Sequence, residues 1–415
     1  MSVSSLPFLH GALAAVLPKL AAWRRDFHAH PEAGWTEFRT AALIIRRLRE
    51  LGYAIRMGEA ACASDRRMGV PSSAVLAAAR ERALEHGADA ELVAGMGDGY
   101  TGFWADLDCG PGPVTAFRFD MDCNEVAECA EESHRPVREG FASRWPGLMH
   151  ACGHDGHAAV GLGLAEVLVS IRRHLRGRIR LIFQPAEEGA RGALPMSEAG
   201  AVDGVDVLFG FHIGFKAEGP GSLICGTQGF LATTKRDVLF SGVPAHAGAA
   251  PEEGKDALLA ACSAVVNLHA ISRNGKGGTR IAVGRLEGGE ARNVIPASAR
   301  LFMETRGETT ELDAYMTAES ERILRASADL WGCACEWRTV GNSAGGGSSP
   351  ELARLIATVA EAMGGWKTVI PMSGFGATED FACLMSRVQA SGGLASYLQV
   401  GTDRAAGHHS DRFDF

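Results

Sequence analysis

Apolar runs that end in polar residues dominate the first half of the chain. Three such runs occupy residues 114–119, 178–183 and 205–209, and each has the length of a β-strand. Between the first two, the apolar spacing of residues 158–171 predicts a buried helix. Strands that alternate with helices favour a mostly parallel α/β sheet, which binds ligands beyond the carboxyl ends of its strands. Polar residues follow each run and are expected to converge there: Asp120 and Asp122, Glu187 and Glu188, and His212.

The pattern changes between residues 229 and 339. The predicted order is strand 233–240, helix 255–272, strands 280–286 and 299–304, helix 310–330 and strand 334–340. This order is that of a ferredoxin-like unit. We therefore expect an inserted α+β lid or dimerisation domain at 229–339, within an α/β catalytic domain formed by residues 1–228 and 340–415.

Three segments outside these regular patterns are interpreted from their local sequence. The glycine-rich stretch 341–349 is predicted to be the hinge back to the catalytic domain; a phosphate-binding loop is the alternative, but no GK[ST] follows it. Ser349 and Pro350 then predict a helix with Ser349 as its N-cap. Residues 60–112 fit neither pattern and are predicted to be a surface insertion that contains a helix.

Composition narrows the class of protein. A chain of 415 residues is long enough for two domains, and its net charge of -8 argues against nonspecific binding of nucleic acid. The ten cysteines follow no disulfide spacing, which favours reduced thiols in the cytoplasm. The apolar segment 6–23 is interrupted by His10, Pro18 and Lys19, so it predicts an amphipathic helix rather than a signal peptide. No apolar run reaches the length of a membrane span.

The stretch 150–157, with the sequence HACGHDGH, carries the densest set of metal-binding side chains. Thiolate and imidazole suit a divalent transition metal, which makes Cys152 and His154 candidate ligands. Asp155 could orient a ligand imidazole by a hydrogen bond. The alternative is a capped helix start with a buried cysteine. Because the other polar clusters are expected at the same edge of the sheet, we favour the metal site.

Glu187 and Glu188 are adjacent, so their side chains point in different directions. One can bind metal while the other faces the substrate, an arrangement that suits hydrolysis because the metal lowers the pKa of a water and the free carboxylate accepts its proton. Asp120 and Asp122 share one side of an extended strand, where they could bind metal or support a ligand. For these groups the alternatives are a solvated loop and, for His212, an ordinary core histidine.

Further candidates lie in the second half of the chain. His408 and His409 offer one more imidazole, unless they belong to a polar tail. In the inserted domain His246, Asn293 and Arg306 could hold a carboxylate and a carbonyl oxygen, although each alone is typical of a surface residue.

Nine motifs in this order resemble the aminoacylase/carboxypeptidase family of dinuclear metallohydrolases, and in particular its amidohydrolase branch. They are HAHPE (28–32), FDMD, HACGHDGH, QPAEEG, FHIG, AHAG, ARNVIP, GATEDF and HHS, and they span nearly the whole chain. The resemblance implies two divalent ions, manganese or else zinc, with Cys152 bridging them and His154, Glu188, His212 and His409 as the other ligands. It implies that Glu187 is the general base and acid, that Asp120, Asp122 and Asp155 support the site, and that His246, Asn293 and Arg306 bind substrate.

The implied activity is hydrolysis of an N-acyl or N-aroyl amino acid, with p-aminobenzoyl-glutamate as the first substrate to expect. A broader N-acyl-amino-acid deacylase or dipeptidase is an alternative, and so is a noncatalytic partner subunit. The resemblance further implies a homodimer or a heterodimer with a homologous second subunit. Family members usually continue beyond the short tail that follows His409, so a shortened chain or a missing last helix is expected. In this tail Asp411 stands where the branch has proline. His408 therefore stays an alternative to His409 as the metal ligand.

Overall fold

The computed structural model describes residues 7–415, which form two compact units. The first comprises the chain up to Gln228 with Gly347–Phe375 and Asp380–Phe415, and the second comprises Gly229–Gly346 with Gly376–Glu379. The predicted N-terminal helix is α1, Pro7–Ala29; Leu6, where the apolar segment begins, lies outside the described residues.

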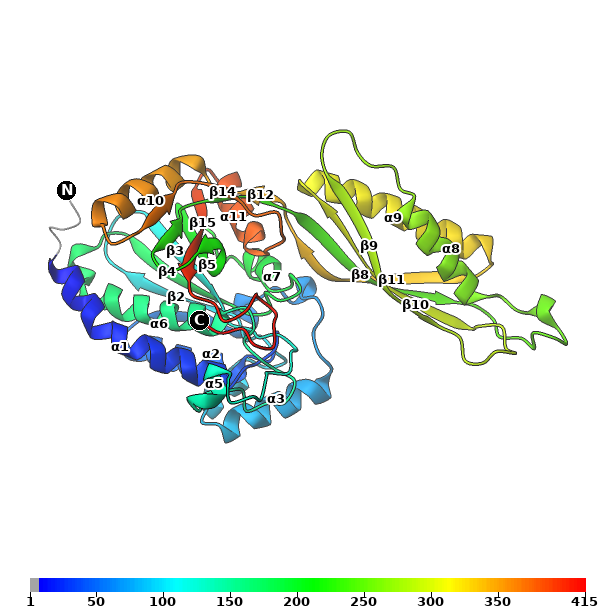
Figure 1. Cartoon of the computed structure of the whole chain (residues 1–415), viewed down its shortest axis with the longest axis horizontal. Coiled ribbons are helices and arrows are strands. Elements are labelled where there is room, and N and C mark those ends of the chain that lie inside the picture. The colour runs from blue at the N-terminus through cyan, green and yellow to red at the C-terminus, as the bar shows by residue number, and fades with distance from the viewer. Residues whose placement is uncertain (1–6) are drawn as a thin grey trace. The chain divides into compact units, whose positions relative to one another are not determined.

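An eight-stranded sheet forms the centre of the first unit (Figure 1). Its order is β1-β2-β4-β3-β5-β15-β6-β13, and the inner strands β4, β3, β5 and β15 run parallel. The strands are β1 Ala54–Met57, β2 Phe103–Asp108, β3 Val114–Asp120, β4 Arg178–Gln184, β5 Val207–Glu218, β6 Ser222–Ile224, β13 Thr368–Ile370 and β15 Leu394–Thr402. Parallel strands are buried on both faces, which explains why β3 and β4 are mostly apolar; Arg118 and Arg180 are buried exceptions.

Helices cover both faces of this sheet. In Figure 1, α1, α2 and α6 lie on one side, and α10 and α11 lie on the other. Gly161 lets α6 approach the sheet, because a Cβ at that position would come within 2.7 Å of Phe183. The helices of the unit are α1 (above), α2 Phe38–Glu50, α3 Ser73–Glu85, α4 Ala90–Gly95, α5 Arg135–Arg138, α6 His154–Ser170, α7 Ala193–Glu198, α10 Pro350–Met363 and α11 Phe381–Ala390.

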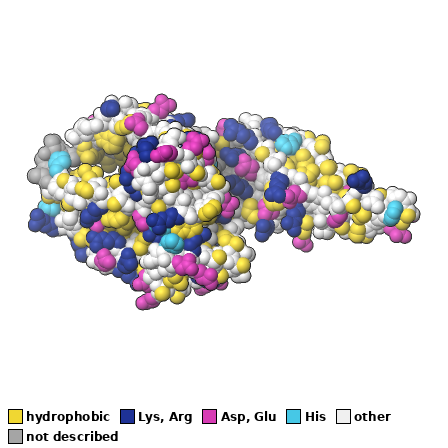
Figure 2. Space-filling view, turned by 60° about the horizontal axis from the view of Figure 1, so that its bottom comes forward, with side chains coloured by type: hydrophobic (Ala, Val, Ile, Leu, Met, Phe, Trp, Pro, Cys, Tyr) yellow, Lys and Arg dark blue, Asp and Glu magenta, His cyan; other side chains and the backbone are white. Residues whose placement is uncertain are grey.

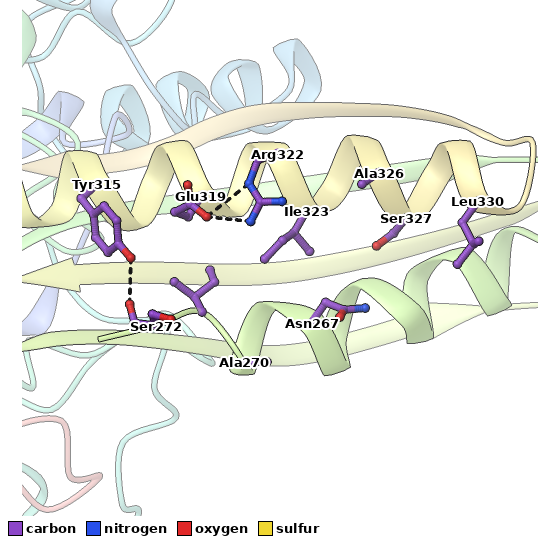
Figure 3. Close-up of a pocket in the computed structure, with 11 residues that line it drawn as sticks. Asn267, Ala270, Ser272, Tyr315, Glu319, Arg322, Ile323, Ala326, Ser327 and Leu330 are labelled. Atoms are coloured by element: carbon purple, nitrogen blue, oxygen red, sulfur yellow. Dashed lines mark hydrogen bonds and ion pairs between the residues drawn. The ribbon is translucent and has the colours of Figure 1, made fainter. Parts of the chain in front are cut away.

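The second unit has a four-stranded antiparallel sheet in the order β11-β8-β10-β9. Its elements follow the ferredoxin-like order: β8 Ala232–Ser241, α8 Ala257–His269, β9 Thr279–Gly288, β10 Ser298–Gly307, α9 Thr310–Leu330 and β11 Ala334–Ser343. Helices α8 and α9 pack side by side over its core, as Figure 3 shows around a pocket where Tyr315 donates a hydrogen bond to the carbonyl oxygen of Ser272.

Three short strands form a further sheet, β12 Gly346–Gly347, β7 Thr227–Phe230 and β14 Ser373–Gly374.

The predicted fold class is confirmed: a mostly parallel α/β sheet is accompanied by a ferredoxin-like α+β unit. Strand β11 runs on to Ser343, so the start of the glycine-rich stretch 341–349 is strand rather than hinge. Ser349 occupies the N-cap position of α10, but its hydroxyl accepts from the Ala395 N–H and does not cap the helix.

The prediction that residues 60–112 form a surface insertion is wrong for a large part of that segment. Strand β2 belongs to the main sheet, between β1 and β4, and is mostly buried. Leu76, Ala79 and Ala83 of α3 pack into the principal core. The sequence pattern failed here because β2 is short, antiparallel and preceded by a glycine-rich turn.

No helix within residues 7–415 combines the length and the apolar character that crossing a membrane requires. Figure 2 shows basic and acidic side chains interspersed over the face that it presents.

Candidate metal centre and active site

The candidate ligands come from four separate segments of the first unit. Cys152 lies in the loop before α6, whose first residue is His154, and Gly153 adopts a φ of 93° that turns the chain between them. Glu188 follows β4, and His409 lies near the C-terminus with a φ of 64°. His212 was expected just beyond the end of its strand, but β5 continues to Glu218 and His212 lies within it.

Cys152 belongs to two groups of potential ligands at once. It forms one group with His154 and His212, and another with Glu188 and His409; within each group the ligand atoms lie within 4.8 Å of one another. The Cys152 Sγ is 3.4 Å from the His212 Nε2, and the His409 Nε2 is 3.4 Å from the Glu188 Oε1. A single thiolate shared by two groups is one arrangement that could hold two neighbouring cations.

The two buried histidines are held in the same way. The Nδ1 of His154 lies 2.9 Å from the carbonyl oxygen of Asp122, and the Nδ1 of His212 lies 2.8 Å from that of Ile213. A carbonyl oxygen can only accept, so each Nδ1 carries a proton, which leaves Nε2 as the ring nitrogen that could bind a metal ion. A hydrogen bond on the second nitrogen is the usual way in which proteins orient a metal-binding imidazole.

Unpaired polar atoms support the fit of a metal to these residues. The Nε2 of His154 and the Oε1 of Glu188 are both buried and lack a hydrogen bond of good geometry within residues 7–415, although the His409 Nε2 lies 3.4 Å from the Glu188 Oε1. Leaving buried polar atoms unpaired is costly, and a metal ion would satisfy both. Thiolate, imidazole and carboxylate together suit zinc or manganese.

The electrostatics of the site fit the same conclusion. Burial raises the pKa of the Cys152 thiol well above its usual value, so deprotonation calls for a nearby cation. Burial also lowers the pKa of His212, which keeps the ring neutral, the form that binds metal. Burial opposes the charge on Glu188, but the His409 hydrogen bond and the charge of His154 outweigh it and lower the pKa to about 2.

Glu187 has the exposure that a proton-transfer group needs. Its side chain is 13% exposed, whereas that of His154 is fully buried, and its Oε2 lies 3.9 Å from the His154 Nε2. The carboxylate therefore reaches the edge of the candidate centre from the solvent side.

Two buried carboxylates fix the loop that carries Glu187 and Glu188. Asp122 accepts hydrogen bonds from the N–H groups of Glu187 at 3.0 Å and Glu188 at 2.9 Å. Glu37 accepts from the N–H of Ala186 at 2.8 Å. Ala186 has a φ of 50°, which is strained for a residue with a side chain, and these three bonds hold it there.

Sequence reasoning missed Glu37. The residue directly precedes α2 and so resembles a helix cap, and nothing in the sequence links it to residue 186, far along the chain. A signal was present in the short spacing between the HAHPE motif at 28–32 and a glutamate in an otherwise apolar surrounding. Burial, and then the charge of Asp122, raise the pKa of Glu37 to about 8.

Replacing Glu37 by glutamine is expected to flatten the pH dependence of stability. The pKa of this carboxyl is about 8 in the folded protein and 4.5 as an ordinary glutamate, so between these values the folded state binds more protons than the unfolded state. The wild-type protein therefore loses stability as the pH rises through this window, and a glutamine side chain, which does not ionise, cannot contribute to that loss. Urea unfolding at several pH values, at equal metal content, measures the difference.

Exposed Glu81 offers the matched control, because glutamine at that position removes a carboxylate that lies outside this network. A gap between wild type and Glu37→Gln that stays constant from ~pH 5 to ~pH 8 would show that Glu37 does not change its ionisation there.

Other buried carboxylates and histidines near the candidate ligands form hydrogen bonds and ion pairs with one another and with the surrounding chain. Asp120 accepts from the His157 Nδ1 at 2.5 Å and pairs with Arg118, while the Nε2 of His157 accepts from the Ile213 N–H at 3.0 Å. Asp155 was expected to orient a ligand imidazole; its carboxylate instead accepts from Arg24 at 2.9 Å and contacts His28 at 2.8 Å, both in α1.

The geometry separates His408 from His409. The Nε2 of His408 lies 3.0 Å from the carbonyl oxygen of Ile213, and its Nδ1 lies 3.1 Å from Arg404, so both ring nitrogens are engaged. His409 faces Glu188, and its N–H donates to the carbonyl oxygen of Ala151 at 2.8 Å. The tail thereby joins the Cys152 loop through His409.

The three candidates in the second unit are not brought together. His246 is exposed, lies beside Val294 in an isolated bridge, and accepts from the N–H groups of Gly248 and Ala249. Asn293 precedes the start of β10, whereas Arg306 lies near its end and pairs with Glu304 at 2.8 Å. Within this unit the sequence-predicted substrate residues occupy two separate places.

Comparison with known proteins identifies the family of this chain. Residues 116–414 match the model of the peptidase family M20/M25/M40. The chain is 45% identical to the A subunit of p-aminobenzoyl-glutamate hydrolase from Escherichia coli, over 97% of this chain and 92% of that protein. It is 44% identical to indole-3-acetyl-aspartic acid hydrolase of Enterobacter agglomerans, over 99% and 94%.

Solved structures add the fold. The aminobenzoyl-glutamate utilization protein of Klebsiella pneumoniae matches with a TM-score of 0.84 and 41% identity, over 95% of this chain and 93% of that one. The YXEP protein of Bacillus subtilis, described as a dinuclear metal binding peptidase of the M20 family, matches with a TM-score of 0.63 and 25% identity, over 97% and 93%. The resemblance inferred from the motifs is thus confirmed, as is the expectation of a hydrolase: the chain belongs to the peptidase family M20/M25/M40.

Proposed function

We propose that this chain hydrolyses the amide bond of N-aroyl or N-acyl amino acids, with p-aminobenzoyl-glutamate as its first substrate. The observation that carries the proposal is the position of Cys152 in two ligand groups, with Glu187 at their edge. The relatives named for p-aminobenzoyl-glutamate and indole-3-acetyl-aspartate both act, by their names, on amides of acidic amino acids.

Two divalent ions are proposed at Cys152, His154, Glu188, His212 and His409. Manganese is proposed because carboxylate and imidazole are ligands that it accepts, and zinc is the alternative that the thiolate favours. Such ions would supply Lewis-acid chemistry, polarising a carbonyl group and lowering the pKa of a water.

The residues of the chain itself account for the proton transfers. Glu187 would accept the proton of the attacking water at its carboxylate and return it to the amide nitrogen that leaves. Asp122 and Glu37 keep this carboxylate in place through the backbone of residues 186–188. His246, Asn293 and Arg306 are proposed to bind the carbonyl oxygen and the α-carboxylate of the substrate.

The assembly and its location stay predictions. Two relatives, from Escherichia coli and Haemophilus influenzae, carry names of an A-type hydrolase subunit, which supports a second, homologous subunit; a homodimer is the alternative. A noncatalytic role in such an assembly is disfavoured by the presence of Glu187 beside a complete ligand set. The cytoplasmic location is likewise a prediction.

Protein reconstituted with manganese or zinc is expected to release p-aminobenzoate from p-aminobenzoyl-glutamate. Indole-3-acetyl-aspartate, hippurate, N-acetyl amino acids and dipeptides, compared by kcat/KM, would define the acyl preference. Faster cleavage of dipeptides than of every N-acyl amino acid would replace this proposal with a dipeptidase, and no cleavage of any amide would leave the noncatalytic role.

A further inference from the structure

A pocket beside the catalytic loop has a positively charged wall. It has a volume of about 510 Å³ and lies entirely within the first unit, bounded by α3 and by the segments around Gly34, Gly69, Glu125 and Arg191. All of α3 belongs to the segment 60–112, to which the sequence alone assigned no role.

Arg191 joins this pocket to the candidate active site. Its Nε donates to the carbonyl oxygen of Glu188 at 2.9 Å, and its Nη1 donates to that of Gly69 at 3.1 Å. A Cβ at Gly34 would come within 2.6 Å of the Arg191 Nη2 and 2.9 Å of the Ala186 Cα, so this backbone lies directly against the loop of Glu187. The pocket is therefore in contact with the loop that carries the proposed base.

Arg82 is the unpaired cation of the pocket. Its guanidinium makes no hydrogen bond or ion pair within residues 7–415, its Nε is buried without a partner, and its face lies 5.4 Å from the ring centre of Trp145. Burial raises the pKa of nearby Glu32 and the charge of Arg82 opposes that rise, but both oxygens of this carboxyl group accept backbone N–H groups, from Arg39 at 2.9 Å and Thr40 at 2.8 Å. A buried donor without a partner leaves an arginine ready for an anionic ligand.

The rest of the pocket lining also favours a negatively charged ligand. Pro71, Ser72 and Val75 line the pocket at the N-terminus of α3, where the helix dipole adds positive potential. Glu125 is the acidic residue of the lining, and it is exposed.

We propose that this pocket binds the side-chain carboxylate of the substrate's amino acid, with Arg82 as the charged partner. The inference rests on the proposed amidase function and deepens it: Arg82 would make the enzyme prefer amides of glutamate and aspartate over amides of neutral amino acids. It also gives α3 a role as one wall of a specificity pocket.

Glutamate and glutamine amides of p-aminobenzoate test the proposal, because they differ in charge and hardly in shape. Arg82→Gln is expected to lower kcat/KM for the glutamate amide ~10–100-fold, mainly through KM, and to leave the glutamine amide nearly unchanged. Arg82→Lys should recover part of the loss, because it restores the charge without the planar fork. The control is Arg46→Gln, which removes one exposed positive charge from α2 outside the pocket.

A second pair of variants avoids any question of folding. Val75 is 51% exposed and lies in the first turn of α3, where aspartate is favourable for the helix. Val75→Asp should weaken cleavage of the glutamate amide selectively, and neutral Val75→Asn should not.

If Arg82→Gln and Val75→Asp lower kcat/KM equally for both amides, or for neither, the pocket does not bind the side-chain carboxylate. The proposed amidase function would still stand. Wild-type protein that cleaves only amides of neutral amino acids would lead to the same two conclusions. If the wild-type protein cleaves no amide, the proposed function fails and the pocket assignment fails with it.

Discussion

Glu187→Gln is expected to lower kcat on the best amide substrate by ~10²–10⁴-fold while the metal content stays at the wild-type level. Glutamine keeps the shape of the side chain but cannot accept a proton. Metal content is the decisive readout, because Glu187 also lies in a group with His154 and Glu188 whose ligand atoms are close together. Steady-state kinetics and elemental analysis of the same preparation provide both numbers.

The neighbouring residue supplies the control for that experiment. Glu188→Gln should lose metal, since Glu188 belongs to a candidate ligand group with Cys152 and His409. If Glu187→Gln loses metal together with activity, or keeps both, the roles assigned to the two glutamates are wrong.

Cys152→Ala is expected to abolish binding of both metal ions and, with it, activity. The reason is that its Sγ belongs to both ligand groups, whereas His212 and His409 each belong to one. The loss of activity should exceed the ~10–100-fold typical of removing a residue that merely supports a ligand. Metal content after dialysis, measured for Cys152→Ala, His212→Ala and His409→Ala, would separate the shared ligand from the others.

Two further variants make that comparison specific. Cys225→Ala removes a fully buried thiol that lies in a separate apolar cluster, and it should keep both metal ions. His408→Ala tests the neighbour of His409, whose ring nitrogens are already engaged by Arg404 and Ile213. Loss of metal from His408→Ala but not from His409→Ala would reverse the assignment within this pair.

Much of the fold could be predicted because its signals are local. The apolar runs that became β3 and β4 are buried on both faces, and the ferredoxin-like unit has elements of clear period and length. Strand β2 could not be predicted in this way, because its place depends on pairing with β4, which is distant in sequence. Ser349 shows the same limit: its hydroxyl is used by Ala395, a contact that only the folded chain creates.

In the candidate site, too, local motifs could be read from the sequence, whereas long-range contacts could not. Residue type and motif pointed to Cys152, His154, Glu188 and His212, because thiolate, imidazole and carboxylate are rare in such density without a metal. The residues that surround these candidate ligands are set by contacts between segments that lie far apart in the sequence. Asp155 contacts α1, Glu37 accepts from the N–H of Ala186, and the buried Arg82 Nε has no hydrogen-bond partner within residues 7–415; the spacing of residues in the sequence predicts none of these.

The distribution of the ligands along the chain bears on how the protein is made. The group of candidate ligands formed by Cys152 and Glu188 also needs His409, so a nascent chain on the ribosome lacks this group until residue 409 emerges. The second unit has a sheet and a core of its own and is complete before residue 409, so it can fold before then, because domains usually fold as units during synthesis. Metal binding by the group with His409 would therefore follow the synthesis of residue 409, whereas the group of Cys152, His154 and His212 is complete in sequence much earlier.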